Sequence, residues 1–274
     1  MGPLLLIGGH EAPRGAALEA FATLAGKGGR IALLTAATED PDAALRRYRE
    51  TFGRLGLGEV LHISAQGRSD CAQREAAQAV EDADGIFFTG GDQLRITSLV
   101  GGTPVEAAIH AARSRGAVVG GTSAGASAMT DTMLVGGQDE EAARRASIRM
   151  CPGLGLLRAA VVDQHFAQRG RINRLIAALA QNPGILGIGI DENTAILVRD
   201  GTRLEVLGEG TVTILDGRGT EVVEASEQDV DRPVALGSVA LWVLRQGYAF
   251  DLDRRMPPHT PSLAGKTSAV PVLR

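Results

Sequence analysis

The sequence predicts an α/β protein built on a mostly parallel sheet with helices on both faces. Short apolar runs alternate with stretches of helical periodicity along the first two thirds of the chain. Unbroken apolar runs of this length are typical of strands that helices cover on both sides. After Asp191 the pattern changes to β-rich runs separated by turn signals, which predicts an antiparallel extension at the C-terminal end.

The order of these elements predicts successive βαβ units. Strands are expected at residues 4–7, 31–35, 60–63, 85–89 and 117–120, and further apolar runs at 159–162 and 188–190 add two more. Helices are expected at residues 15–25, 42–55, 71–83 and 104–113, the last with a proline in its first turn. Asp-Gly pairs at 200–201 and 216–217 flank β-rich runs at 204–207 and 211–215, which predicts a closing antiparallel meander.

Residues 1–256 are predicted to form a single domain. The tail at 257–274 has prolines at 257, 258, 261 and 271 and no periodicity, so we expect it to be extended. The apolar opening at 4–7 ends at a glycine pair and is far shorter than the roughly 20 residues of a membrane span. We therefore expect no membrane association.

Composition excludes several classes of protein. A net charge of −4 and 3% aromatic residues give neither a surface for nucleic-acid phosphates nor a platform for base stacking. The two cysteines cannot form a disulfide framework, and no His/Cys cluster has metal-ligand spacing. We expect a cytoplasmic protein that uses neither a metal nor another cofactor and does not bind nucleic acid.

The segment from Gly121 to Gly125 has the pattern G-x-S-x-G directly after a predicted strand. Glycines on both sides allow the sharp turn that exposes a nucleophilic serine, here Ser123. Helix N–H groups that follow the turn can stabilise an oxyanion. The alternative is a Gly/Ser-rich loop that binds phosphate or only turns. A nucleotide-binding protein is less favoured, because the glycine pair after the first strand lacks the third glycine of G-x-G-x-x-G and no P-loop motif occurs.

A nucleophilic serine needs a base, and the chain has five histidines: His10, His62, His110, His165 and His259. His165 follows the strand at 159–162, where side chains reach the ligand-binding edge of a sheet. His62 and His110 fall inside a predicted strand and a predicted helix, which favours structural roles. A helix cap or a core position is the alternative for His165.

The base needs a carboxylate to orient it, and the candidates are Asp163, Asp191 and Glu192. Asp163 is two residues from His165 and would have to fold back onto it. Asp191 and Glu192 end the strand at 188–190, at the expected carboxyl edge. The residues alone favour this pair and do not choose between its members.

Five blocks of the sequence occur in a fixed order: Phe88-Thr89-Gly90-Gly91-Asp92-Gln93, Gly121 to Ala126, Asp163-Gln164-His165-Phe166, Arg169-Gly170-Arg171 with Arg174-Leu175, and Gly187 to Ala195. Together these blocks resemble the cyanophycinases and are similar to the wider serine peptidase family that also contains the aspartyl dipeptidase peptidase E. The resemblance runs in order from residue 4 to about residue 255.

This resemblance implies a flavodoxin-like sheet and a serine-type exopeptidase that forms an acyl-enzyme. The implied substrate is cyanophycin, a polyaspartate with arginine side groups, and the implied products are β-Asp-Arg dipeptides. Ser123 is then the nucleophile, His165 the base and Glu192, rather than Asp191, the orienting acid. Backbone N–H groups of Gly91 and Ala124 form the oxyanion hole. The implied substrate-pocket residues are Gln93, Asp163, Gln164, Arg169, Arg171 and Arg174.

Two alternatives to this activity stay open. One is a related serine peptidase that acts on other aspartyl or isoaspartyl peptides. The other is a silent relative that only binds acidic peptides, against which the complete set of Ser123, His165 and Glu192 argues. A homodimer is a candidate assembly that the sequence does not decide.

The helix after His165 supports a polar substrate in its own right. Its apolar residues at 172, 175, 176 and 179 have helical spacing and are expected to face the core. This places Arg171 and Arg174 on an exposed flank, where guanidinium groups can meet substrate carboxylates. A solvated face is the alternative.

Overall fold

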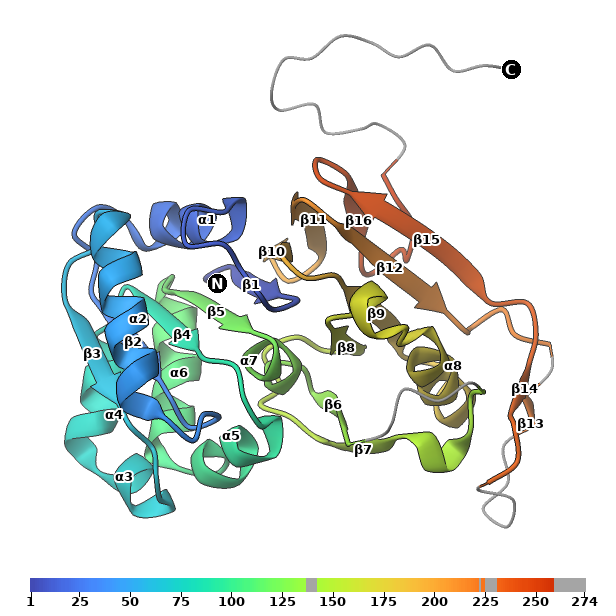
Figure 1. The fold of residues 1–274 in the computed structure, drawn as a ribbon, viewed down its shortest axis with the longest axis horizontal. Coiled ribbons are helices and arrows are strands. Elements are labelled where there is room, and N and C mark those ends of the chain that lie inside the picture. The colour runs from blue at the N-terminus through green and yellow to red at the C-terminus, as the bar shows by residue number, and fades with distance from the viewer. Residues whose placement is uncertain (137–141, 222, 225–230, 259–274) are drawn as a thin grey trace, which may run out of the picture.

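The main sheet has eight strands and confirms the predicted α/β class (Figure 1). The computed structural model describes residues 1–136, 142–221, 223–224 and 231–258. Parallel strands form one part of this sheet, in the spatial order β3 (Val60–Ile63), β2 (Ile31–Leu34), β4 (Gly85–Phe88), β5 (Val118–Thr122) and β1 (Leu4–Ile7). Antiparallel strands β10 (Thr194–Arg199), β11 (Arg203–Gly208) and β16 (Ala249–Asp251) continue the sheet beyond β1.

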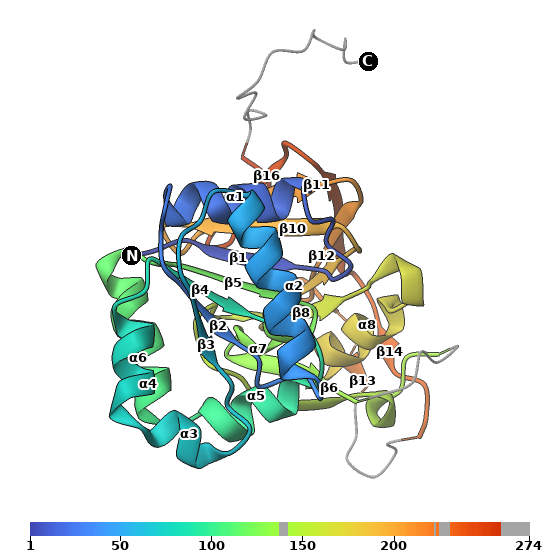
Figure 2. The ribbon, with the colours of Figure 1, turned by 60° about the vertical axis from the view of Figure 1, so that its left-hand side comes forward.

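Helices cover both faces of the main sheet, as the apolar runs predicted. Residues alternate between the two faces, so that Leu4 and Leu6 of β1 belong to one core and Leu5 and Ile7 to the other. Helices α1 (Ala16–Ala25) and α2 (Pro41–Arg54) lie on the Leu5 face (Figure 2). The opposite face packs against α3 (Arg68–Ala72), α4 (Arg74–Glu81), α5 (Gln93–Val100), α6 (Pro104–Arg115) and α7 (Ala124–Ala128).

A second sheet shares the core on the Leu4 side. Its strand order is β15 (Ala240–Arg245), β12 (Thr211–Asp216), β9 (Leu186–Ile190) and β8 (Ala160–Gln164), and β8 and β9 are parallel. Helix α8 (Ile172–Gln181) covers the outer face of this sheet (Figure 1). The smaller elements are β6 (Thr132–Val135), β7 (Arg149–Pro152), β13 (Val223–Glu224), β14 (Ala235–Leu236), and the 3₁₀ turns η1 (Arg145–Ser147) and η2 (Ala167–Arg169).

Three features differ from the sequence prediction. The strands after Asp191 are antiparallel as predicted, and Asp200-Gly201 joins β10 to β11. The single meander is wrong, because β11 and β12 lie in different sheets; the chain turns between them at Gly208, where φ is +104°. The helix predicted at 71–83 is two helices, because Gln73 is extended, with ψ at 137°. Helix α5 was not predicted, although the Asp92 carboxylate accepts a hydrogen bond from the Leu94 N–H and caps its start.

The predicted tail falls almost entirely outside the described residues, which end at 258. None of the helices in the described ranges combines the length and the apolar character needed to cross a membrane.

Backbone hydrogen bonds hold the ends of four strands together. The N–H groups of Ser123 and His165 donate to the carbonyl oxygens of Ile7 and Gly8 over 2.9 and 2.8 Å, and the Asn193 N–H donates to Gly9 over 2.9 Å. The residues that follow β1, β5, β8 and β9 therefore meet at one edge of the fold, where the predicted site residues lie.

The packing of α7 on the main sheet depends on Gly125. A Cβ atom there would lie 2.6 Å from the Phe88 carbonyl oxygen of β4. We expect Gly125→Ala to lower the free energy of unfolding by about 1 to 3 kcal/mol, measured by urea denaturation. The control is Gly53→Ala, in α2, where an added Cβ has nothing within 4 Å. This change should raise the free energy of unfolding by about 0.5 to 1 kcal/mol. Equal effects of the two changes would contradict the proposed packing constraint.

Candidate active site

Ser123 stands on a sharp turn between β5 and α7. Its backbone angles are φ 51° and ψ −111°, a strained conformation for a residue with a side chain. Gly121 permits this turn, because a Cβ there would lie 2.6 Å from the backbone of Gly125 in the first turns of α7. The strand-turn-helix context that the G-x-S-x-G pattern predicted is therefore present.

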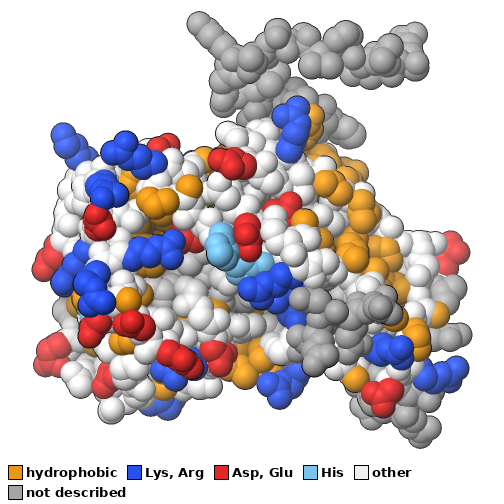
Figure 3. All heavy atoms as spheres, viewed as in Figure 1, with side chains coloured by type: hydrophobic (Ala, Val, Ile, Leu, Met, Phe, Trp, Pro, Cys, Tyr) orange, Lys and Arg blue, Asp and Glu red, His pale blue; other side chains and the backbone are white. Residues whose placement is uncertain are grey.

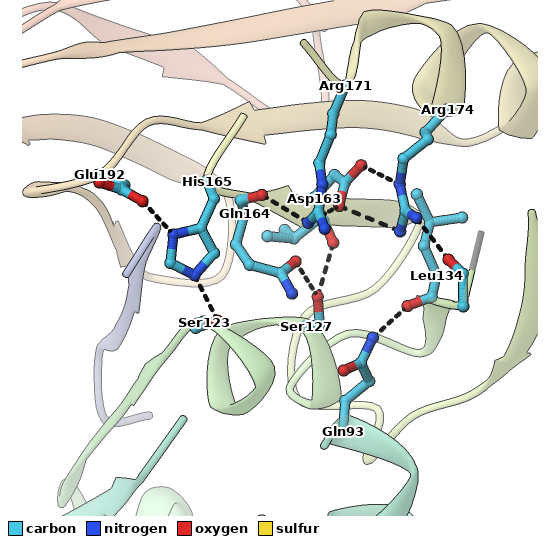
Figure 4. Close-up of polar contacts among 12 residues, drawn as sticks. Gln93, Ser123, Ser127, Leu134, Asp163, Gln164, His165, Arg171, Arg174 and Glu192 are labelled. Carbon is cyan, nitrogen blue, oxygen red and sulfur yellow. Dashed lines mark hydrogen bonds and ion pairs between the residues drawn. The ribbon is translucent and has the colours of Figure 1, made fainter. Parts of the chain in front are cut away.

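A chain of hydrogen bonds connects Ser123, His165 and Glu192 (Figure 4). Ser123 Oγ lies 2.9 Å from His165 Nε2, and His165 Nδ1 lies 2.7 Å from Glu192 Oε1. Nδ1 donates to the carboxylate, so Nε2 is free to accept from the serine hydroxyl. The side chain of His165 is 8% exposed and that of Glu192 is 29% exposed.

Asp191 faces away from the imidazole. Its Oδ1 accepts from the Ala167 N–H over 3.0 Å, and its Oδ2 accepts from the N–H and the hydroxyl of Thr211. These contacts tie the ends of β9 and β8 to β12. Of the two acids that the residues alone left open, Glu192 is the one whose carboxylate contacts the imidazole.

Burial lowers the pKa of His165 below its ordinary value, because a buried imidazole is less stable in its charged form. The hydrogen bond that His165 donates to Glu192 opposes this effect, while the positive charge of Arg169 adds to it. The result is an imidazole that is unprotonated, and able to accept a proton, at neutral pH.

The residues predicted to stabilise an oxyanion are Ala124, which follows Ser123, and Gly91, in the turn whose Gly90 lies near Ser123. Ala124 is the buried first residue of α7. Gly90 lies close to Ser123, because a Cβ atom at Gly90 would be 3.5 Å from the Cβ of Ser123. Gly91 has φ +140°, and a Cβ there would lie 2.1 Å from the Ala37 carbonyl oxygen, so this turn requires glycine.

The exposed positions predicted for the side chains of Arg171 and Arg174 are wrong. These residues are 8% and 4% exposed, and both side chains pair with Asp163, which is fully buried on β8. Arg174 Nε lies 2.8 Å from Asp163 Oδ2, and Arg171 Nη1 lies 3.1 Å from Oδ1. A buried carboxylate needs such partners. Burial raises the pKa of Asp163, and the two guanidinium groups oppose that rise.

The three other predicted pocket residues have different surroundings. Gln164 is also buried, and its side-chain oxygen lies 2.9 Å from Ser127 Oγ. Gln93, at the start of α5, donates to the Leu134 carbonyl oxygen over 2.7 Å. Arg169 is exposed in η2. Figure 4 shows the Asp163 cluster beside the serine and histidine.

Sequence reasoning missed the loop after β1. A Cβ on Gly9 would lie 2.3 Å from His165 Cε1, so this glycine leaves room for the imidazole. The Glu11 carboxylate is buried and accepts from Tyr48 over 2.7 Å and from the Thr122 hydroxyl over 2.5 Å. Glycine at the strand end was a visible signal, but no local pattern marked Glu11.

A cleft of about 490 Å³ opens next to this loop. Its walls include Gly90 and Thr122, which lie next to Ser123. They also include Asp40, the residue before α2, and Arg47 of α2. Arg47 contacts Glu11 through a 2.9 Å ion pair. Figure 3 shows histidine side chains reaching the surface near the middle of this face, beside acidic and basic groups.

The remaining histidines have other surroundings. His62 Nε2 lies 2.9 Å from Thr35 Oγ1, and His110 Nε2 lies 3.1 Å from the Leu154 carbonyl oxygen, in agreement with structural roles. His259 lies outside the described residues.

A serine on a strand-turn-helix bend that is hydrogen-bonded to a histidine and through it to a carboxylate defines a class of α/β serine hydrolases. The chain belongs to Peptidase family S51, whose sequence profile matches residues 4–206.

Relatives with high similarity cover most of the chain. A protein of Synechococcus elongatus named cyanophycinase is 37% identical over 231 residues, which cover 84% of this chain and 71% of that protein. A cyanophycinase of Trichormus variabilis is 38% identical over 261 residues, covering 92% of this chain and 86% of that protein. A solved peptidase structure from an acI-B1 Actinobacterium shares the fold, with a TM-score of 0.69, 21% identity and coverage of 92% and 97%.

The lowered pKa of His165 predicts how Ser123 reactivity depends on pH. The rate at which a fluorophosphonate labels Ser123 should rise with pH as the imidazole loses its proton, with a midpoint below about 6.5. Arg169→Gln should move this midpoint upward, because it removes a positive charge that disfavours protonation. Arg158→Gln, at the opposite end of β8, is the control and should leave it in place. A midpoint above 6.5 in the wild type would contradict the burial argument.

The Asp163 cluster predicts a stability effect. Arg174→Ala leaves a fully buried carboxylate with one of its two guanidinium partners. We expect the free energy of unfolding to fall by about 3 to 5 kcal/mol in urea denaturation. Arg199→Ala, at an exposed position at the end of β10, should change it by less than about 0.5 kcal/mol. If Arg174→Ala were as stable as the wild type, the ion pair would have no structural role.

Proposed function

We propose that the protein is a serine exopeptidase that hydrolyses cyanophycin and releases β-Asp-Arg dipeptides. The observation that carries this proposal is the hydrogen-bonded chain from Ser123 through His165 to Glu192. Membership of a peptidase family and the high identity to proteins named cyanophycinase support the substrate.

In the proposed mechanism, His165 Nε2 takes the proton of the Ser123 hydroxyl as Oγ attacks the scissile carbonyl carbon. Glu192 holds the imidazole in the required tautomer and stabilises its charged form. The N–H groups of Gly91 and Ala124 donate to the negatively charged oxygen. His165 then gives its proton to the departing amine, which leaves an acyl-enzyme on Ser123. Water, deprotonated by His165, hydrolyses that ester and restores the serine.

The charges around the site suit a polymer of aspartate and arginine. Among the proposed pocket residues, Arg169 offers an exposed guanidinium to substrate carboxylates, whereas the side chains of Gln93 and Gln164 hydrogen-bond to Leu134 and Ser127. Asp163, Arg171 and Arg174 are buried as one cluster, and we propose that they hold the segment that carries His165 and Arg169 in position. The cleft next to the β1 loop presents both a carboxylate, that of Asp40, and a guanidinium, that of Arg47.

The direct test is to incubate the purified protein with cyanophycin and identify the products by mass spectrometry, with Ser123→Ala as the blank. β-Asp-Arg as the main product supports the proposal. No release from cyanophycin, together with cleavage of other aspartyl or isoaspartyl dipeptides, would replace it with the related peptidase activity. Turnover by Ser123→Ala would exclude Ser123 as the nucleophile.

The two acidic neighbours provide a sharper test of the triad. Glu192→Gln should lower kcat on cyanophycin by roughly a hundredfold or more, since a triad acid can contribute up to about 10⁴. Asp191→Asn should lower kcat less, because Asp191 contacts Ala167 and Thr211 rather than the imidazole. Circular dichroism checks that both variants are folded. A larger loss of kcat in Asp191→Asn would refute the assignment of Glu192.

Two further expectations remain predictions. A homodimer would be detected by sedimentation, and the cytoplasmic location by fractionation of the host cell.

A further inference from the structure

His10 lies beside the triad without belonging to it. It follows the glycine pair after β1 in a left-handed conformation, with φ 48°. Its ring packs edge-on against that of His165, with 5.4 Å between ring centroids, and its Nε2 lies 3.7 Å from Glu192 Oε1. Within the described residues, His10, His165 and Glu192 form one group whose ligand atoms all lie within 4.8 Å of one another.

Two imidazoles and a carboxylate are a common ligand set for zinc, with three protein ligands leaving a fourth position for water. At ordinary zinc–ligand distances, two ligand atoms of a tetrahedral ion lie roughly 3.4 Å apart. The separations from Glu192 Oε1, 2.7 Å to His165 Nδ1 and 3.7 Å to His10 Nε2, lie on either side of that value. The side chain of His10 is 71% exposed, so an ion can enter from solvent.

We propose that His10, His165 and Glu192 form a binding site for a zinc ion that reversibly inhibits the enzyme. The binding part stands on geometry alone, and the inhibition part rests on the proposed function. An ion between Glu192 and the imidazole takes the lone pair of His165 Nδ1. The proton that Nδ1 carried moves to Nε2. The ring therefore keeps one proton and stays neutral, and the positive charge belongs to the ion. Nε2 then donates and cannot accept the proton of Ser123.

The site should be selective. Imidazole ligands suit zinc and neighbouring transition metals, whereas magnesium and calcium prefer oxygen ligands. Inhibition by zinc is compatible with the expectation that the reaction itself uses no metal, since the ion occupies the nitrogen that must carry a proton during catalysis.

Binding is tested first, without reference to turnover. Zinc chloride is titrated into Ser123→Ala protein in a calorimeter, and the same is done for Ser123→Ala with His10→Gln. One ion per chain is expected, with affinity at least about tenfold weaker in the double variant. Ser123→Ala with His110→Gln is the control for an unrelated histidine, and magnesium chloride is the control for the ion. Absence of zinc binding, or equal affinity with and without His10, overturns the proposal.

Inhibition is tested by measuring the rate of cyanophycin hydrolysis by the wild type and by His10→Gln. For each protein, the rate with zinc is compared with its own rate without zinc. The expected result is that zinc slows the wild type, that EDTA restores its rate, and that zinc slows His10→Gln at least about tenfold less effectively. Equal inhibition of both proteins would place the inhibitory ion elsewhere and overturn the inhibition part. If the wild type fails to hydrolyse cyanophycin, the proposed function fails, while the calorimetric result still decides the zinc site.

Discussion

Left-handed backbone at the ends of strands is the constraint on which the site depends. Ser123, His165 and Asn193 have φ between 50° and 51°, and each lies at the end of a strand that reaches the same edge. Such a conformation costs on the order of 1 to 3 kcal/mol for a residue with a side chain. It turns the chain so sharply that the side chain projects from the end of the strand and does not follow the alternation of side chains between the two faces of the sheet.

Hydrogen bonds to the β1 loop fix these bends. The N–H groups of Ser123, His165 and Asn193 donate to three successive carbonyl oxygens, those of residues 7, 8 and 9. The loop after β1 therefore supports Ser123, His165 and the segment that carries Glu192. Its glycine at position 9 also leaves the space that the imidazole fills, because any Cβ there would collide with the ring. Backbone and side-chain positions in the site are thus coupled.

Buried charges secure the outer parts of the same edge. Asp163 joins β8 to the start of α8 through two guanidinium groups, and Glu11 joins the β1 loop to α2 and to Thr122. A buried carboxylate is stable only where donors surround it, so each one ties together the elements that supply those donors. Neither cluster contains the hydrogen bonds of the triad, yet both adjoin residues that do.

The sequence by itself determined the α/β class, the parallel strands and the sharp turn at Ser123, because these depend on local signals. Apolar runs mark buried strands wherever they pair, and G-x-S-x-G encodes a turn within five residues. Helix breaks were harder to predict: the extended residue at Gln73 has no glycine or proline to announce it. The blocks shared with a known family selected Glu192, which local pattern could not separate from Asp191.

Only the tertiary structure decided how distant segments meet. Helical periodicity placed Arg171 and Arg174 on one flank of the helix and so predicted exposure, but the helix packs on a strand that presents a buried carboxylate. Both side chains turn inward to it. Strands β11 and β12 look like one meander, yet they pair in different sheets because pairing depends on partners far along the chain. The His10, His165 and Glu192 cluster has no ligand spacing in the sequence, since its members come from three separate strand ends that backbone hydrogen bonds bring within 4.8 Å.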